Sequence, residues 1–169
     1  MIVHVPMMIC PNPKRVLIIG GGDGGAAREV LKHENLEKFV MIDIDEVVVN
    51  TCKEHMPSLN AGAFDDPRLE LIIGDGIDYV NKAADGSFDV IIVDSTDPIP
   101  DSCGEVLFTS AFYEQCKRVL SKDGVISTQS IMPMRYNKEI YQKSISNLQG
   151  AFTKEKTWVY LIPTDTYNG

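Results

Sequence analysis

The chain has 169 residues, and 44% of them are hydrophobic, which is enough for one α/β domain with a buried core. Sixteen Lys and Arg residues against 24 Asp and Glu residues give a formal net charge of −8. This charge argues against nucleic acid and anionic membranes as partners. The apolar runs are far shorter than the about 20 residues of a membrane-spanning helix, and no signal-peptide pattern is present, so we expect a cytoplasmic protein.

Short β-rich runs alternate with helical stretches along the chain. Residues 1–14 come first and have no periodicity; we interpret them as a lead-in from an N-terminal segment that this chain lacks. The predicted strands are 15–19, 38–42, 69–73, 88–93, 124–128 and 158–162, and the predicted helices are 25–33, 46–56, 77–83, 109–120 and 137–149, with Pro57 and Gly150 as stop signals. The alternation predicts an α/β, Rossmann-like domain over residues 15–169, with a mostly parallel sheet, helices on both faces and at least one closing strand missing at the C-terminal end.

Acidic residues and glycines follow four consecutive predicted strands. The first strand runs into residues 20–25, the second into Asp43, the third into Asp75 and Gly76, and the fourth into Asp94. Parallel sheets bind ligands beyond the carboxyl ends of their strands. One such Asp is often only a helix N-cap, but four together indicate a binding site.

The glycine-rich segment contains Gly20, Gly22 and Gly25, which match the GxGxxG pattern of dinucleotide-binding proteins. Asp23, however, adds a negative charge where a pyrophosphate would need the positive end of the next helix. We therefore favour a nucleoside with a cationic substituent over NAD, with Asp23 holding an ammonium group.

Asp43 and Asp75 complete a pocket for such a nucleoside. Asp43 can accept hydrogen bonds from both ribose hydroxyls. Asp75 can accept one from the exocyclic amine of adenine, while Gly76 admits the base. Together these residues predict an S-adenosyl-type pocket in a fold that methyltransferases share.

Asp94 and Asp97 lie three residues apart at the end of the fourth strand. Such a pair can act as a general base, bind an amine or hold a divalent metal. No histidine lies at ligand spacing nearby, and the four cysteines have no metal-binding or CxxC spacing, so we expect no metal.

Several segments together resemble the polyamine aminopropyltransferases, the family that includes spermidine synthase. The resemblance covers nearly the whole chain. It is carried by segments 4–6, 11–14, 16–25, 28–30, 42–45, 74–76, 89–98 and 107–108, by Gln129 and by segment 162–164, of which the long Gly/Asp loop and Asp94-Ser95-Thr96-Asp97-Pro98 are the most specific.

This resemblance implies transfer of an aminopropyl group from decarboxylated S-adenosylmethionine, a co-substrate, to a diamine such as putrescine, with no cofactor. By position, Asp23 resembles the residue that binds the donor amine, Asp43 the ribose residue and Asp75 the adenine contact. Asp94 corresponds to the catalytic base, and Asp97, Gln129 and Tyr167 to residues that bind the diamine. The resemblance further implies a homo-oligomer, dimer or tetramer, in the full-length protein.

Four departures from the family pattern and three alternatives accompany this interpretation. Asp43 stands where the family usually has Glu, and the turn after Asp97 is two residues longer. Asp165 follows segment 162–164 where the family has Tyr, so that Tyr167 comes two residues later, and we expect the family's N-terminal β-domain to be missing from this chain. An S-adenosylmethionine methyltransferase, a non-catalytic nucleoside or polyamine binder, and, least favoured, an NAD dehydrogenase are the alternatives. The sequence leaves the amine acceptor open.

Overall fold

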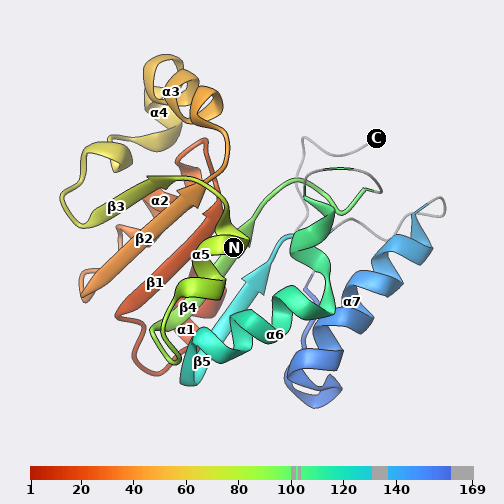
Figure 1. The fold of residues 1–169 in the computed structure, drawn as a ribbon. Helices are drawn as coiled ribbons and strands as arrows, with labels where there is room; N and C mark the ends of the chain where they lie inside the picture. The colour runs from red at the N-terminus through yellow and green to blue at the C-terminus, as the bar shows by residue number, and fades with distance from the viewer. Residues whose placement is uncertain (100–101, 103, 131–136, 161–169) are drawn as a thin grey trace.

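A computed structural model describes residues 1–99, 102, 104–130 and 137–160 of the chain. Five parallel strands form one sheet in the order β3-β2-β1-β4-β5, with all arrows pointing the same way in Figure 1. The strands are β1 (Arg15–Gly20), β2 (Lys38–Asp43), β3 (Leu69–Ile73), β4 (Phe88–Asp94) and β5 (Leu120–Thr128). The strand order reverses between β1 and β4, which makes this the position where an open α/β sheet binds its ligand.

Alternate side chains of the central strands enter two separate hydrophobic cores. On β1, Val16 and Ile18 belong to one core and Leu17 and Ile19 to the other. All four are at most 3% exposed, as expected for a strand covered on both faces. The predicted α/β fold with helices on both faces is confirmed.

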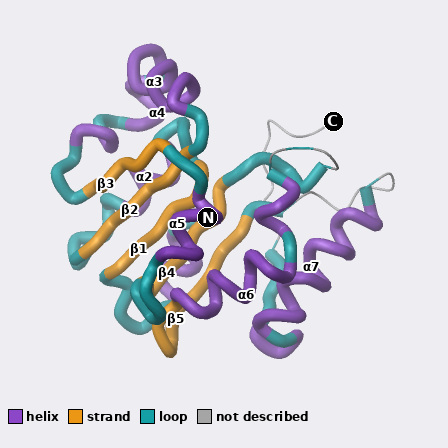
Figure 2. Tube along the Cα trace, viewed as in Figure 1, coloured by secondary structure: helices purple, strands orange, loops and turns teal. Residues whose placement is uncertain are grey.

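The helices divide between these two faces, as Figures 1 and 2 show. One core includes side chains of α5 (Gly76–Lys82), α6 (Ser110–Val119) and α7 (Lys138–Phe152). The other includes side chains of α1 (His4–Ile9) and α2 (Gly25–Val30). α3 (Glu46–His55), α4 (Pro57–Asn60) and the short helix η1 (Ala63–Asp65) connect β2 to β3, while η2 (Glu105–Phe108) precedes α6 and η3 (Lys154–Lys156) follows α7.

The first 14 residues differ from the prediction, because they contain α1 instead of an aperiodic lead-in. Val3, Met7 and Cys10 are buried in the core, and Pro6 falls in the first turn of the helix, where a missing N–H costs nothing. His4 also ties α1 to α2, since its Nε2 lies 2.8 Å from Glu29 Oε2 and its Nδ1 lies 3.1 Å from His33 Nε2.

Three further element ends differ from the sequence prediction by more than one residue, and one predicted strand has no counterpart in the described residues. α2 ends at Val30 instead of residue 33, and β5 begins at Leu120 instead of residue 124. Gly150 does not stop α7, which continues to Phe152. The predicted sixth strand has no counterpart at residues 158–160, which have no strand assignment, and the rest of it lies outside the described residues. No helix in the described part of the chain is long and apolar enough to cross a membrane.

Candidate active site

The candidate site lies where β1 and β4 end side by side. Gly20 is in register with Asp94, and the Gly21 N–H donates to the Asp94 carbonyl over 2.8 Å. A Cβ atom at Gly20, which has φ +84°, would lie only 2.2 Å from that carbonyl oxygen. Glycine is therefore required here, both by the left-handed backbone and by the close approach of the two strands.

Gly22 lets the loop after β1 approach the end of β2. A Cβ atom at this position would lie 2.7 Å from Asp43 Oδ2 and 3.1 Å from Val48 Cγ1. Asp43 itself is only 9% exposed. The loop and the Asp43 carboxylate thus form one wall of the site.

Three of the predicted site carboxylates use one oxygen to order their own backbone. Asp43 Oδ1 accepts from the Asp45 N–H over 2.9 Å, Asp23 Oδ1 from the Gly25 N–H over 2.7 Å, and Asp75 Oδ1 from the Ile77 N–H over 2.7 Å. Within the described residues, the Oδ2 atoms of these carboxylates make no hydrogen bond. Each side chain therefore has an acceptor available for a ligand.

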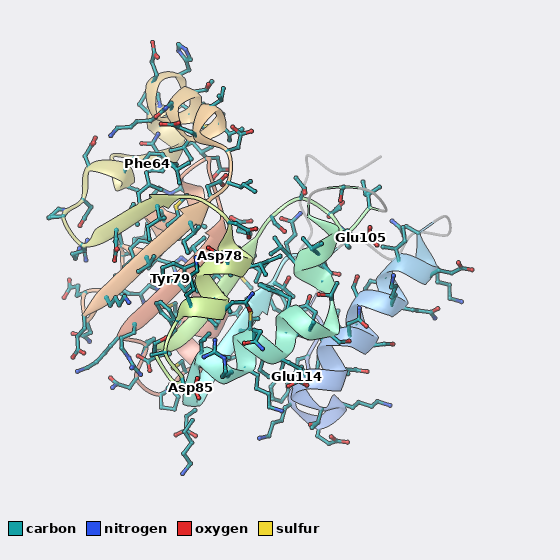
Figure 3. All side chains as sticks on the ribbon, viewed as in Figure 1. Phe64, Asp78, Tyr79, Asp85, Glu105 and Glu114 are labelled. Carbon is teal, nitrogen blue, oxygen red and sulfur yellow. The ribbon has the colours of Figure 1, made fainter. Side chains whose placement is uncertain are left out.

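The N-terminal end of α2 is already occupied by protein groups. Asp23 Oδ1 accepts a hydrogen bond from the N–H of Gly25, the first residue of α2, and a Cβ atom at Gly24 would lie within 3 Å of Asn60 and Phe64. Phe64, labelled in Figure 3, belongs to η1 between α4 and β3. A pyrophosphate at this helix end would have to displace the Asp23 carboxylate and the side chains packed against Gly24, which argues against the dinucleotide alternative.

Asp94 has the most perturbed carboxyl group of the site. Burial, followed by the negative charges of Asp23 and Asp43, raises the pKa of Asp94 to about 6. In the part of the chain that the structure describes, no ion pair joins these three carboxylates to a basic side chain. Among the described residues, the three carboxylates consequently form a negative cluster without a compensating positive charge, which favours a cationic ligand.

Asp97 and Gln129 come together from β4 and β5. The Gln129 amide donates to Asp97 Oδ1 over 3.4 Å, and the Gln129 N–H donates to the Val93 carbonyl over 3.0 Å. Residue 93 directly precedes Asp94, so the two predicted diamine residues lie beside the predicted base.

The structure thus brings the predicted residues of strands β1, β2, β4 and β5 to one edge of the sheet. Asp75 and Gly76 follow β3 at the same edge; Gly76 is also required for packing, because a Cβ atom there would lie 2.6 Å from Ile19 Cγ2. Tyr167 lies outside the described residues. Sequence reasoning missed Val48, whose only signal was its position five residues after Asp43.

Metal binding has no support in the described ranges, where no group of three His, Cys, Asp or Glu side chains has a suitable arrangement.

Comparison with known proteins identifies relatives over almost the whole chain. The family model described as "Spermine/spermidine synthase domain" matches residues 1–169. The polyamine aminopropyltransferase of Thermoanaerobacter sp. (strain X514) is 48% identical over 164 residues, which are 97% of this chain and 57% of that protein. The protein of the same name from Clostridium tetani is 44% identical over the same shares of the two chains. The chain therefore spans somewhat more than half the length of the curated relatives it matches.

Solved structures agree with the sequence matches. Spermidine synthase from Thermotoga maritima superposes with a TM-score of 0.81 and 43% identity, over 90% of this chain and 50% of that one. A spermidine synthase in complex with the transition state analogue AdoDATO gives a TM-score of 0.84 with the same identity and coverage. With a family model matching every residue and relatives at this identity, the chain belongs to the spermine/spermidine synthase domain family.

Proposed function

We propose that the chain supplies the catalytic domain of a polyamine aminopropyltransferase. The donor in this proposal is decarboxylated S-adenosylmethionine and the acceptor is a diamine, putrescine first. The products are spermidine and methylthioadenosine. The family membership supports the reaction class, and the charge of the candidate site supports the choice of substrates.

One observation carries the proposal: burial, followed by the nearby negative charges of Asp23 and Asp43, raises the pKa of Asp94 to about 6. Such a cluster is stabilised by cations and destabilised by anions. The proposed donor brings a sulfonium and an ammonium group, and the acceptor brings a second ammonium. Intact S-adenosylmethionine would add a carboxylate next to Asp23, and NAD would add a pyrophosphate.

The proposed step is a single displacement at carbon. The neutral amine nitrogen attacks the aminopropyl carbon next to the sulfonium sulfur, and a C–N bond forms as the C–S bond breaks. The bonding electrons return to sulfur, which leaves as the neutral thioether of methylthioadenosine. The nitrogen then loses one proton, and the reaction balances without an oxidant or a metal.

Asp94 is the proposed partner of the attacking nitrogen. An amine has an ordinary pKa of about 10.4, so a carboxylate is a weak base for it even with a pKa near 6. Orientation of the nitrogen and stabilisation of its developing positive charge are therefore the main contributions that we assign to Asp94. Asp97, held by Gln129, anchors the acceptor.

Calorimetry with methylthioadenosine, decarboxylated S-adenosylmethionine, intact S-adenosylmethionine and NAD tests the proposal on one sample. We expect the first two ligands to bind more tightly than the last two. Asp43→Ala should weaken methylthioadenosine binding by a few kcal/mol, as the loss of a charge-assisted hydrogen bond does. Tighter binding of intact S-adenosylmethionine would support a methyltransferase instead, and tighter binding of NAD would exclude the proposed pocket.

A further inference from the structure

We propose that Asn60 is a positioning residue for the donor: it holds residues 59–64 against Gly24 and so keeps the Asp23 carboxylate where the donor ammonium binds. The inference rests on the proposed function, in which that ammonium lies next to Asp23. Asn60 belongs to the connection between β2 and β3, which the proposed reaction itself does not use.

Asp23 is an exposed residue in a loop that has little rigidity of its own. Five of the six residues 20–25 are glycines, and glycine has the widest choice of backbone conformations. Within the described residues, the side chain of Asp23 makes one hydrogen bond, the local one to the Gly25 N–H. The position of the carboxylate therefore depends on what packs against the loop.

Gly24, the residue after Asp23, is buried beneath residues 59–64. A Cβ atom at Gly24 would lie 2.6 Å from Asn60 Cβ and 2.8 Å from Cε2 of Phe64, which is labelled in Figure 3. Because Gly24 has no side chain, these two residues pack directly on the backbone of the loop. If they withdraw, the loop gains free space next to Asp23.

The side-chain amide of Asn60 holds this packing in place. Asn60 is 4% exposed. Its Nδ2 donates to the carbonyls of Cys52 and Met56, at the C-terminal end of α3, over 3.1 and 3.0 Å, and its Oδ1 accepts from the Gly62 N–H over 3.0 Å. Both donor hydrogens of the amide and its oxygen are thus used to tie residues 59–64 to α3.

The turn that follows Asn60 has an unfavourable backbone conformation. Ala61 has φ +48° and Gly62 has φ +78°, so two consecutive residues are left-handed. Alanine rarely adopts this conformation, which persists only where its surroundings enforce it. The hydrogen bond from Gly62 to Asn60 Oδ1 closes around Ala61 and enforces it. Without this bond Ala61 can relax, and the packing on Gly24 loosens.

Arg28 attaches the same segment to α2 by a separate contact. Its Nη1 donates to the Leu59 carbonyl over 2.5 Å, and this bond does not involve the Asn60 side chain. Removal of the Asn60 amide therefore leaves the segment attached to α2. We expect Asn60→Ala to fold, with the change confined to the turn and to the loop beneath it.

Two ligands distinguish positioning of Asp23 from a merely structural role. Methylthioadenosine and decarboxylated S-adenosylmethionine share the adenosine and the sulfur, but only the donor carries an aminopropyl ammonium. Displacement of Asp23 weakens the donor alone, whereas a general loss of structure weakens both ligands. The ratio of the two affinities is therefore the quantity to measure.

Calorimetry with both ligands and no amine acceptor measures this ratio. We expect Asn60→Ala to weaken donor binding about tenfold, the effect of disturbing one charge-assisted hydrogen bond, and to change methylthioadenosine binding by less than about twofold. Phe64→Ala, which removes the ring from Gly24, should give the same selective loss. In an Asp23→Asn background, Asn60→Ala should cause no further loss of donor affinity, because both changes act on one contact.

Val119→Ala is the matched control. Val119 is fully buried and directly precedes Leu120, where β5 begins at the opposite edge of the sheet from the site. The cavity lowers the stability of the protein, as loss of the buried Asn60 amide does. Thermal unfolding measures this loss in each variant, and we expect Val119→Ala to keep the wild-type ratio of affinities.

Three results would overturn the inference: a wild-type ratio in Asn60→Ala, equal losses for the two ligands, or a further loss of donor affinity in the Asp23→Asn background. If Asn60→Ala does not fold, Phe64→Ala decides by the same criteria. A wild-type protein that binds neither ligand would instead overturn the proposed function, before any variant is made.

Discussion

Replacing Asp94 with asparagine should stabilise the unliganded protein at neutral pH. Burial destabilises the ionised carboxylate of Asp94, and the negative charges of Asp23 and Asp43 destabilise it further. Together these effects raise the pKa of Asp94 from 3.8 to about 6. A shift of this size corresponds to about 3 kcal/mol of folding free energy, as an upper bound. Asparagine has nearly the same shape and no charge, so Asp94→Asn removes this cost.

The gain should depend on pH in a defined direction. Because the folded-state pKa of Asp94 is raised, its favourable contribution is complete below about pH 3.8 and is lost as the pH rises through about 6. Asp94→Asn should therefore exceed the wild type in stability above about pH 6 and match it near pH 4. Urea unfolding at a series of pH values measures the free energy of unfolding of both proteins. Subtracting one value from the other at each pH removes the contribution of the groups that titrate in both.

Asp75→Asn is the control for this experiment. Asp75 caps α5 through the Ile77 N–H, and asparagine is an equally good N-cap, so the stability should change by less than about 0.5 kcal/mol at any pH. The reasoning fails if Asp94→Asn destabilises the protein near pH 8, or if its gain is the same near pH 4.

Three further predictions follow from the site and its surroundings. Turnover of the amine should fall as the pH drops below about 6, because protonated Asp94 can no longer stabilise the ammonium; a profile that is flat down to about pH 5 would contradict this. Gly22→Ala should lower methylthioadenosine affinity at least about tenfold in calorimetry while the circular dichroism spectrum stays native, since the new methyl group meets Asp43 Oδ2. Gly150→Ala should raise the unfolding free energy by about 0.5–1 kcal/mol, because Gly150 is an exposed helical residue with open space around its Cβ position; a loss of stability would refute it.

The sequence predicts the sheet well because buried parallel strands read as continuous apolar runs. Residues such as Val16, Leu17, Ile18 and Ile19 leave little choice of secondary structure, and the order of strands and helices follows from them. Because all the strands are parallel, their carboxyl ends lie at one edge of the sheet, and the acidic residues that follow them could be assigned to that edge. The alternation of strands and helices does not reveal which carboxylates lie close enough to interact electrostatically. The raised pKa of Asp94 depends on its burial and on those distances, so it could be found only in the structure.

The missed elements depended on tertiary contacts. α1 is short and contains proline, and its helical spacing of Val3, Met7 and Cys10 becomes visible only once the core is known. Gly150 is a poor helix residue, yet burial of Ala151 and packing of Phe152 carry α7 past it. For Asp75 the sequence favours either helix capping or ligand binding; in the structure its Oδ1 caps α5 and its Oδ2 makes no hydrogen bond within the described residues, so both roles are compatible.

The backbone hydrogen bond between Gly21 and Asp94 fixes the distance between the two sides of the site. It sets the spacing between the loop after β1 and the end of β4 by sheet register, which side-chain rotamers cannot alter. A change of spacing would need a slip of the whole strand and would turn its buried side chains to the opposite core. If the proposed function holds, adaptation to acceptors of different length is confined to groups outside this register, such as Asp97 and Gln129, whose amide donates to it.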